Sequence, residues 1–356
     1  MRYIGNKENL LDTISMVFEE NKIKGNSFFD FFSGTTNVGK FFKKQGLEIY
    51  SSDILYFSFV LQKAYLENNS YPEFKNLIDT IPNNTTSLFD DNFDKVIAYL
   101  NSLEGIEGFI YKNYTPDGTK DLEIPRMYFN SENGMLIDAI RVKIEDWFKS
   151  NLITESEYYI LIASLIETVP FYANISGVYA AFHKKWDPRA VKKMILRKPE
   201  IIISNDTLNH IGYNANSIEL LDIIEADIFY LDPPYNQRQY APNYHILETI
   251  AKYDNPIIKG VSGLRDYSNQ KSRFCNKNTA LEDLDYIAKE GKFKYLVLSY
   301  NNEGIMGTEN IMEVLKKYGN LNLVEIDYAR YKSNSNGENS NKRVIKEQLY
   351  ILKKAN

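Results

Sequence analysis

The pattern of apolar and polar positions predicts alternating strands and helices at the start of the chain. Short apolar runs at residues 27–32 and 47–52 predict two strands. Each run is followed by a segment with helical periodicity, at residues 36–46 and at residues 54–67. This strand–helix–strand–helix order is typical of an α/β fold with a parallel sheet.

The same alternation returns after residue 200. Strands are predicted at residues 201–204, 227–231, 295–299, 323–331 and 343–352. The last two runs flank the Asn/Ser/Gly-rich segment 333–341, so they are predicted to pair across a turn as antiparallel strands.

Helical periodicity dominates the middle of the chain. Residues 93–100 and 158–166 are examples, and the Pro/Gly/Asp/Thr-containing segment 113–120 reads as a loop. These patterns predict an α/β domain formed by residues 1–70 and 200–356. A mostly helical block, residues 71–199, is inserted into it.

The composition of the chain excludes several kinds of protein and of site. The chain has 356 residues, 44% of them hydrophobic, which is ample for a packed core, and its net charge of −5 does not indicate nucleic-acid binding by itself. A single cysteine, Cys275, excludes an intrachain disulfide and a cysteine-rich metal site, and the three histidines show no ligand spacing, so no metal is expected. The chain shows neither a signal-peptide core nor a membrane-length apolar run, so we expect a cytoplasmic protein without membrane contact.

The tetrad Asp232-Pro233-Pro234-Tyr235 follows an apolar strand, at the position where open α/β sheets bind ligands. A carboxylate at Asp232 and the carbonyl of Pro233 can accept the two N–H bonds of an exocyclic amine and free its lone pair. Two prolines stiffen this corner, and Tyr235 offers a flat face for an unstacked base. The competing interpretation is an ordinary rigid Pro-Pro turn.

A second group of residues predicts a nucleoside-binding edge. Asp30, Phe32 and Gly34 lie at the tip of the first strand, and Asp53 ends the next strand about 20 residues on, where an acid can bind ribose hydroxyls. The pattern is neither Gly-x-Gly-x-x-Gly nor a phosphate loop, so a ligand without phosphates is favoured, such as S-adenosylmethionine.

In these motifs the chain resembles Dam-like, alpha-group adenine-N6 DNA methyltransferases of the restriction–modification kind. The resemblance rests on the tetrad, on residues 3–7, 30–34, 205–206 and 343–347, and on Asp53, and on their order along nearly the whole chain. It implies a Rossmann-like methyltransferase sheet that uses S-adenosylmethionine, with residues 71–199 as the target-recognition domain.

The resemblance also assigns roles to single residues. Lys7 would approach the methionine carboxylate of the cofactor, and Asp30 its amino group. Phe32 would pack beside the methionine, Asp53 would hold the ribose, and Asp206 would accept the adenine amino group. The cofactor-binding set is therefore predicted to comprise Tyr3, Lys7, Asp30, Phe32, Gly34, Asp53 and Asp206. The catalytic set is Asp232, Pro233, Pro234 and Tyr235.

A local basic cluster predicts a DNA-binding face. Residues 183–198 carry seven basic side chains, although a solvated helix face is the competing interpretation. Two segments extend this DNA-binding face: the polar residues directly after the tetrad, and the long stretch 254–278. We predict that this stretch is a loop that becomes ordered on DNA. The predicted DNA contacts are Lys184, Lys185, Arg189, Lys192, Lys193, Asn236, Arg238, Tyr240, Arg265 and Lys342.

The expected activity is therefore methylation of adenine N6 in a specific duplex site by base flipping. We expect a monomer that functions alongside a restriction endonuclease. Three alternatives stay open at this stage: cytosine-N4 methylation, methylation of RNA or of a protein glutamine amide, and a non-catalytic DNA-binding subunit. Methylation at carbon 5 of cytosine is disfavoured, because it needs a thiol and Cys275 follows Phe274 rather than a proline.

Overall fold

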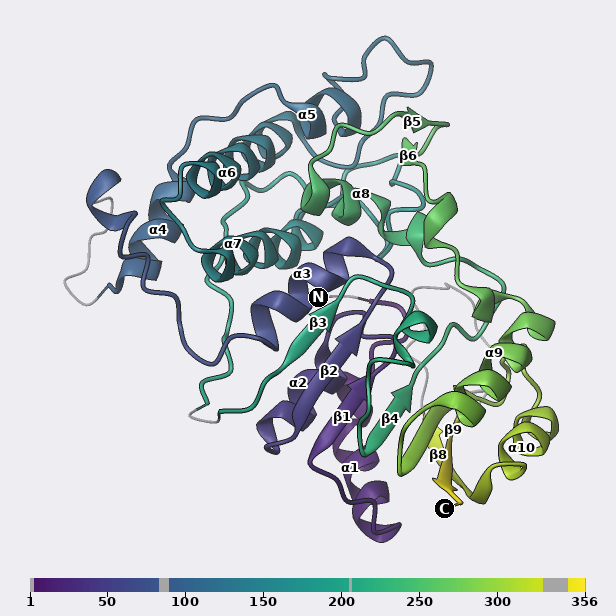
Figure 1. Ribbon diagram of the computed structural model, residues 1–356. Helices are drawn as coiled ribbons and strands as arrows, with labels where there is room; N and C mark the ends of the chain where they lie inside the picture. The colour runs from purple at the N-terminus through teal and green to yellow at the C-terminus, as the bar shows by residue number, and fades with distance from the viewer. Residues whose placement is uncertain (1–2, 83–89, 205–206, 329–344, 356) are drawn as a thin grey trace. The chain divides into compact units, whose positions relative to one another are not determined.

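The computed structural model describes residues 3–82, 90–204, 207–328 and 345–355 (Figure 1). The chain divides into two compact units, which we call the sheet unit and the helical unit. The sheet unit comprises Asn6–Ile54, Thr207–Tyr240 and Gln270–Asn356. The helical unit comprises Met1–Gly5, Leu55–Asp206 and Ala241–Asn269. The helical unit therefore extends beyond residues 71–199, and the recognition role of that block stays a prediction.

A seven-stranded, mostly parallel sheet organises the sheet unit (Figure 1). Its strands are β1 (Ser27–Asp30), β2 (Glu48–Ser52), β3 (Ile211–Tyr213), β4 (Ile228–Leu231), β7 (Tyr295–Asn301), β8 (Gly319–Tyr328) and β9 (Ile345–Lys354). Their order in the sheet is β3-β2-β1-β4-β7-β9-β8. The first five are parallel, and β9 is antiparallel to both neighbours, β7 and β8. The predicted parallel α/β sheet with a terminal antiparallel pair is confirmed.

One predicted strand is wrong. Residues 201–204 form no strand, and the sheet instead takes its edge strand β3 from residues 211–213. The run at 201–204 is apolar, but Ile203 is 69% exposed, and the backbone N–H of Ser204 donates to Asn69 within the helical unit. An apolar run forms a strand of a parallel sheet only when both of its faces are covered, and Ile203 in this run is exposed instead.

Helices cover both faces of the sheet. On one face, Phe28 of β1 stacks on Phe42, which stacks in turn on Phe18. These two outer rings belong to α2 (Asn37–Lys44) and α1 (Leu11–Glu20). Because parallel strands are buried on both faces, they form continuous apolar runs instead of alternating with polar residues.

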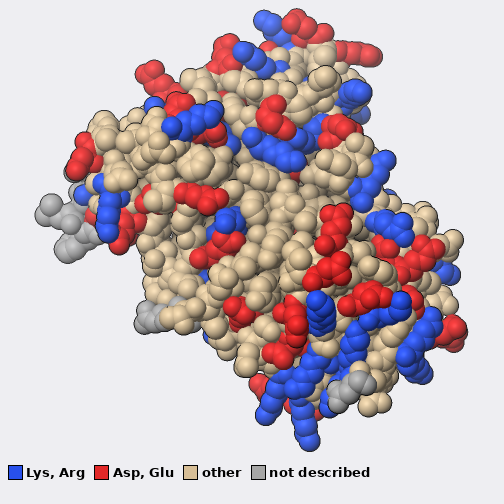
Figure 2. All heavy atoms as spheres, in the orientation of Figure 1, with Lys and Arg blue, Asp and Glu red and all other residues tan. Residues whose placement is uncertain are grey.

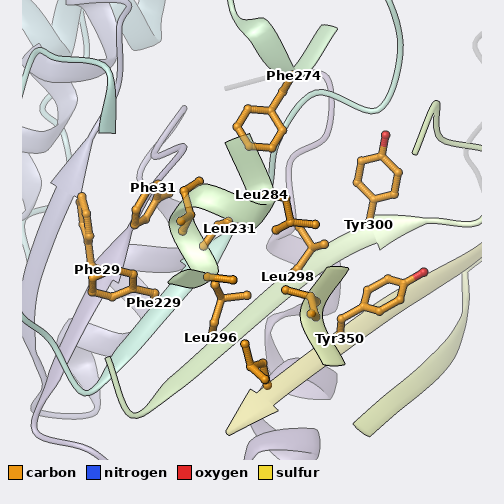
Figure 3. Packing of buried hydrophobic residues seen from close by; sticks show 14 of the residues in the cluster. Phe29, Phe31, Phe229, Leu231, Phe274, Leu284, Leu296, Leu298, Tyr300 and Tyr350 are labelled. Carbon is orange, nitrogen blue, oxygen red and sulfur yellow. The ribbon is translucent and has the colours of Figure 1, made fainter. Parts of the chain in front are cut away.

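The other face of the sheet carries a large apolar cluster, shown in Figure 3. Phe29 of β1 and Phe31, just after this strand, pack against Phe229 of β4. Leu284 and Ile311, from two helices, complete the cluster. These helices are α9 (Lys277–Glu290) and α10 (Thr308–Lys316). Successive side chains of a strand point to opposite faces of the sheet, as Phe28 and Phe29 do. Asp30 therefore lies on the same face as Phe28.

The helical unit packs amphipathic helices against one another (Figure 1). Its elements are α3 (Tyr56–Tyr65), α4 (Asn92–Asn101), α5 (Phe109–Tyr114), α6 (Ser131–Lys149), α7 (Glu155–Thr168), α8 (Ala241–Lys252), and the hairpin β5 (Ile258–Lys259) and β6 (Leu264–Arg265). A capping box of Thr154 and Glu157 starts α7, and Glu248 of α8 accepts the first N–H groups of α3. Helical periodicity at 93–100 and 158–166 correctly predicts α4 and α7.

The stretch 254–278 is more structured than a loop. It contains the hairpin β5–β6, two short 3-10 segments, Ser268–Gln270 and Arg273–Cys275, and the start of α9. Its polar composition conceals these elements because each is only two or three residues long. Within the described part of the chain, we find no helix with the length and apolarity to cross a bilayer.

Candidate active site

Three carboxylates end adjacent strands of the sheet. Asp30 is the last residue of β1, Asp53 follows β2, and Asp232 follows β4. Because β2, β1 and β4 are neighbours and parallel, these acids meet at one edge of the sheet unit. This is the edge at which open α/β sheets bind their ligands.

The turn after β1 contains Gly34 with a left-handed backbone, at φ +50°. Its N–H donates to Oδ2 of Asp53 at 2.9 Å, which orients that carboxylate. Phe32, half-buried in the same turn, lies edge-on to Phe274 with the ring centroids 5.2 Å apart. The turn brings together three of the residues that the sequence predicted.

Asp30 is buried, and among the described residues its Oδ2 atom has no hydrogen-bond partner. Burial, followed by the negative charges of Asp232 and Asp53, raises the pKa of Asp30 to about 8. A buried acceptor without a donor is costly in a folded protein. Asp30 is therefore suited to receive a positively charged donor from a ligand.

Asp232 lies in a hydrogen-bonded network rather than as an isolated acceptor. Its Oδ1 accepts from the hydroxyl of Tyr235 at 2.7 Å and lies 3.2 Å from Nζ of Lys7. Burial raises the pKa of Asp232 to about 6, although the Lys7 charge opposes this shift. Pro233 and Pro234 are buried, as expected of a rigid corner.

Glu347 of β9 completes this network and was not predicted as a site residue. Its Oε1 accepts from Lys7 at 2.7 Å, from Tyr235 at 2.8 Å and from Ser299 at 2.6 Å. A signal was present: Glu347 shares a strand face with Leu349, and the four residues after Gln348 are apolar. An acid on an apolar strand face is a candidate for a functional buried charge.

The site is rich in negative charge. The charges of Asp53 and Asp232 act on Asp30, and that of Glu347 acts on Asp232. Lys7, 5% exposed, supplies a positive charge between Asp232 and Glu347, and the two acids raise its pKa against the opposing effect of burial. Four carboxylates at one edge favour a ligand that carries positive charge.

Two further predicted cofactor residues, Tyr3 and Asp206, are not among the described residues of the sheet unit. In the helical unit Tyr3 stacks on Tyr244 with the ring centroids 4.5 Å apart, and the N–H of Ile4 donates to the Tyr244 hydroxyl at 2.7 Å. Asp206 and Lys342, with neighbouring residues 205, 343 and 344, lie outside the described residues. The roles assigned to Tyr3, Asp206 and Lys342 stay predictions.

The predicted DNA contacts differ in their surroundings. Lys184, Lys185, Lys192 and Lys193 are exposed in the helical unit. Arg189 donates twice to Asp187, at 3.0 and 2.7 Å. Figure 2 shows basic and acidic side chains mixed over much of the face in view, with basic ones gathered in its lower part.

Arg265 is buried and donates to Asp254 at 3.0 and 2.7 Å, so its charge is already used inside the helical unit. In the sheet unit, Asn236 and Arg238 are exposed just after the tetrad, where the Asn236 side chain accepts the Arg238 N–H. Tyr240 is half-buried. Of these residues, Asn236 and Arg238 are accessible to a ligand, whereas Arg265 has a structural role that its sequence context did not reveal.

Comparison with known proteins places this site in a family. The model of the D12 class N6 adenine-specific DNA methyltransferases matches residues 3–320, and the chain belongs to this family. It is 40% identical to the type II methyltransferase M.FokI of Planomicrobium okeanokoites, over 99% of this chain and 53% of the relative. It is 36% identical to the modification methylase StsI of Streptococcus sanguinis, over 99% and 52%.

A third relative matches end to end. The type II methyltransferase M.NlaIII of Neisseria lactamica is 35% identical over 99% of both chains. The chain thus spans about half the length of M.FokI and StsI and nearly all of M.NlaIII. The expected resemblance to adenine-N6 DNA methyltransferases is confirmed at the level of the family.

Proposed function

We propose that this protein transfers a methyl group from S-adenosylmethionine to N6 of adenine in duplex DNA. The observation that carries the proposal is the Asp232–Tyr235 corner at the end of β4, adjacent in the sheet to Asp30, whose Oδ2 atom has no partner among the described residues. Family membership and the type II methyltransferase relatives support the same activity, with a restriction endonuclease as functional partner. Adenine is favoured over cytosine because the matching family model is adenine-specific.

The residues present fit S-adenosylmethionine. Oδ2 of Asp30 needs a donor, which an α-ammonium group would supply, and the surrounding carboxylates favour a cation. Asp53, already oriented by Gly34, offers an oxygen to ribose hydroxyls. When bound, the cofactor supplies an electrophilic methyl group and a positive charge that is lost in the reaction.

The protein's own contribution is positioning. Asp232 accepts one N–H bond of the adenine amine, the Pro233 carbonyl accepts the other, and the lone pair of the nitrogen is directed to the methyl group. The Tyr235 ring, edge-on to Tyr300 at 5.0 Å, borders the corner with its hydroxyl bonded to Asp232. The rate enhancement comes from acceptors that are fixed before the substrate arrives.

A labelling experiment tests the proposal. The protein is incubated with duplex DNA and S-adenosylmethionine carrying a radiolabelled methyl group, and the DNA is digested to nucleosides. We expect label in N6-methyladenine. Label in N4-methylcytosine would support the cytosine alternative, and binding of DNA without incorporation would support a non-catalytic subunit.

We also propose that Lys184 and Lys185 bind DNA phosphates. The double variant K184A/K185A should weaken binding to all duplex sequences and reduce the slope of log K against log salt concentration by about two units. The measurement is fluorescence anisotropy over a salt series. As a matched control, K22A/K24A removes two exposed lysines that precede β1, at the opposite end of the strand from Asp30, and should leave the slope unchanged.

The tip of the hairpin β5–β6 is a further proposed DNA contact. Val261 is 58% exposed, yet the guanidinium of Arg126 holds the tip by donating to the carbonyls of Gly260 and Val261, both at 3.0 Å. The neighbouring Ser262 hydroxyl donates to Ala180, close in sequence to Lys184. A rigid apolar tip beside exposed lysines is suited to enter a groove or replace an extruded base.

Val261→Ser should therefore weaken duplex binding several-fold while the melting temperature stays unchanged, since the side chain is already in solvent. Titration of labelled duplex and thermal unfolding measure the two effects. Ile223→Ser, at a 69% exposed position before β4, is the matched control and should leave binding unchanged. Equal affinities of V261S and the wild type would exclude the tip from the DNA contact.

A further inference from the structure

The network around the catalytic corner contains one hydroxyl proton that two carboxylates share. The hydroxyl of Tyr235 lies 2.7 Å from Oδ1 of Asp232 and 2.8 Å from Oε1 of Glu347. It has a single proton, so it can donate to only one of the two carboxylates at a time. Lys7 also lies within reach of both, at 3.2 Å from Asp232 and 2.7 Å from Glu347.

Asp232 and Glu347 therefore compete for the Tyr235 proton, whereas the ammonium group of Lys7 carries three protons and can donate to both. When Tyr235 donates to Oδ1 of Asp232, that oxygen is a weaker acceptor for a further group. When Tyr235 donates to Glu347, Oδ1 loses that donor and accepts more readily. Glu347 is suited to hold the Tyr235 hydroxyl, because it is 4% exposed and its Oε1 also accepts from Lys7 and from Ser299, at 2.7 and 2.6 Å.

The sheet explains why Glu347 reaches the corner. Asp30 pairs in register with Tyr230, Tyr230 with Val297, and Asn301 with Glu347. Residues in register share a sheet face, and so do alternate residues of one strand, so Glu347 lies on the same face as Asp30 and Ser299. The network joins three strands and the N-terminal segment through that face.

We propose that Glu347 is a positioning residue, which withdraws the Tyr235 hydroxyl from Asp232 and shares the charge of Lys7, so that Asp232 can accept the substrate amine. This inference rests on the proposed methyltransferase activity and adds a residue to it. Glu347 touches neither substrate nor cofactor in this account, and it acts only through its two donors. Its effect should therefore appear in kcat rather than in binding.

The charged and titratable groups that act on Asp232 include Lys7, Tyr235 and Glu347 around it, Asp30 from β1, and Tyr230 from β4. The carboxylate of Glu347 raises the pKa of Asp232, whereas Lys7 lowers it. Glu347→Gln keeps the shape and removes the charge. Lys7 should then pair more closely with Asp232, and the pKa of Asp232 should fall.

The test compares E347Q with the wild type in steady-state methylation at saturating substrate over a range of pH. We expect kcat to fall about ten- to a hundredfold, the acid limb of the pH profile to move to lower pH, and affinities for DNA and S-adenosylmethionine to change less than about threefold. In a Lys7→Met background E347Q should add less than it does alone. Glu325→Gln, an exposed acid on β8 paired with Lys346, is the control and should retain wild-type kcat.

The outcomes separate the two proposals. A wild-type protein that transfers no methyl group would refute the proposed function itself. An active wild type and a folded E347Q with the same kcat and the same acid limb would overturn the role of Glu347 alone. If E347Q unfolds, Ser299→Ala, which removes only the hydroxyl donor to Glu347, takes its place: a lower kcat with a shifted acid limb supports the role, and an unchanged profile overturns it.

Discussion

Replacing Asp232 with alanine is expected to reduce methyl transfer by at least about a thousandfold while duplex DNA still binds. The variant removes the only side-chain acceptor of the proposed corner and leaves the Pro233 carbonyl alone. The amine then keeps its lone pair in the adenine ring. Radiolabel transfer measures the first effect, and fluorescence anisotropy with the same duplex measures the second.

Asp232→Asn is the informative companion of D232A, because it retains one oxygen acceptor without the charge. Its activity should lie between those of D232A and the wild type. In the wild type, kcat should fall as the pH drops through about 6, since a protonated Asp232 accepts less well. D232N has no carboxyl there and should lose this acid limb. Full activity of D232A would refute the corner as the catalytic site.

Asp30→Asn is expected to have two large effects of opposite sign. Binding of S-adenosylmethionine should weaken about 30- to 100-fold, because the proposed partner of its ammonium group loses its charge. Above about pH 8 the cofactor-free protein should become more stable, because there a buried carboxylate with an unpaired oxygen is replaced by a neutral group. Calorimetric titration and thermal unfolding measure the two.

The direction of the pH effect follows from the raised pKa of Asp30, about 8 in the folded protein against 3.8 for an ordinary aspartate. Folding favours the protonated acid, so the wild type should lose stability as pH rises from about 4 to 8, by a few kcal/mol in order of magnitude. D30N should not show this loss. An ammonium ligand favours the carboxylate, so cofactor affinity should rise toward pH 8 in the wild type and change less in D30N.

Asp12→Asn provides the matched control for D30N. Asp12 lies exposed in the first turn of α1 and belongs to the same unit. It should change neither cofactor affinity nor the dependence of stability on pH. An unaltered affinity in D30N would exclude Asp30 from the cofactor site, whatever its effect on stability.

Much of the site could be predicted because its motifs are local. The corner Asp232–Tyr235 directly follows its strand, and the turn of Gly34 directly follows β1, so neighbouring residues define both. The parallel order could also be predicted, since each buried strand is an apolar run followed by a helix. The apolar run at 201–204 shows the limit of this reasoning, because periodicity does not say whether a partner strand is available.

Contacts between distant residues could not be predicted. Lys7 and Glu347 are 340 positions apart, and only the pairing of β9 with β7 brings Glu347 to the same face as Asp30. The pairing of Arg265 with Asp254, 11 positions away, was hidden for a different reason: a basic residue in a polar stretch has the same sequence signature whether it is paired or free.

The sequence by itself determined the class of fold, the catalytic tetrad and the acids at the strand ends, because these depend on periodicity and on residues adjacent along the chain. Only the tertiary structure decided which charges meet: the pairing of Lys7 with Asp232 and Glu347, and the unpaired oxygen of Asp30. The reason is physical. The pKa of a buried group depends on its desolvation and on the charges near it in space. Strand register determines which charges those are, and it brings together residues hundreds of positions apart in the chain.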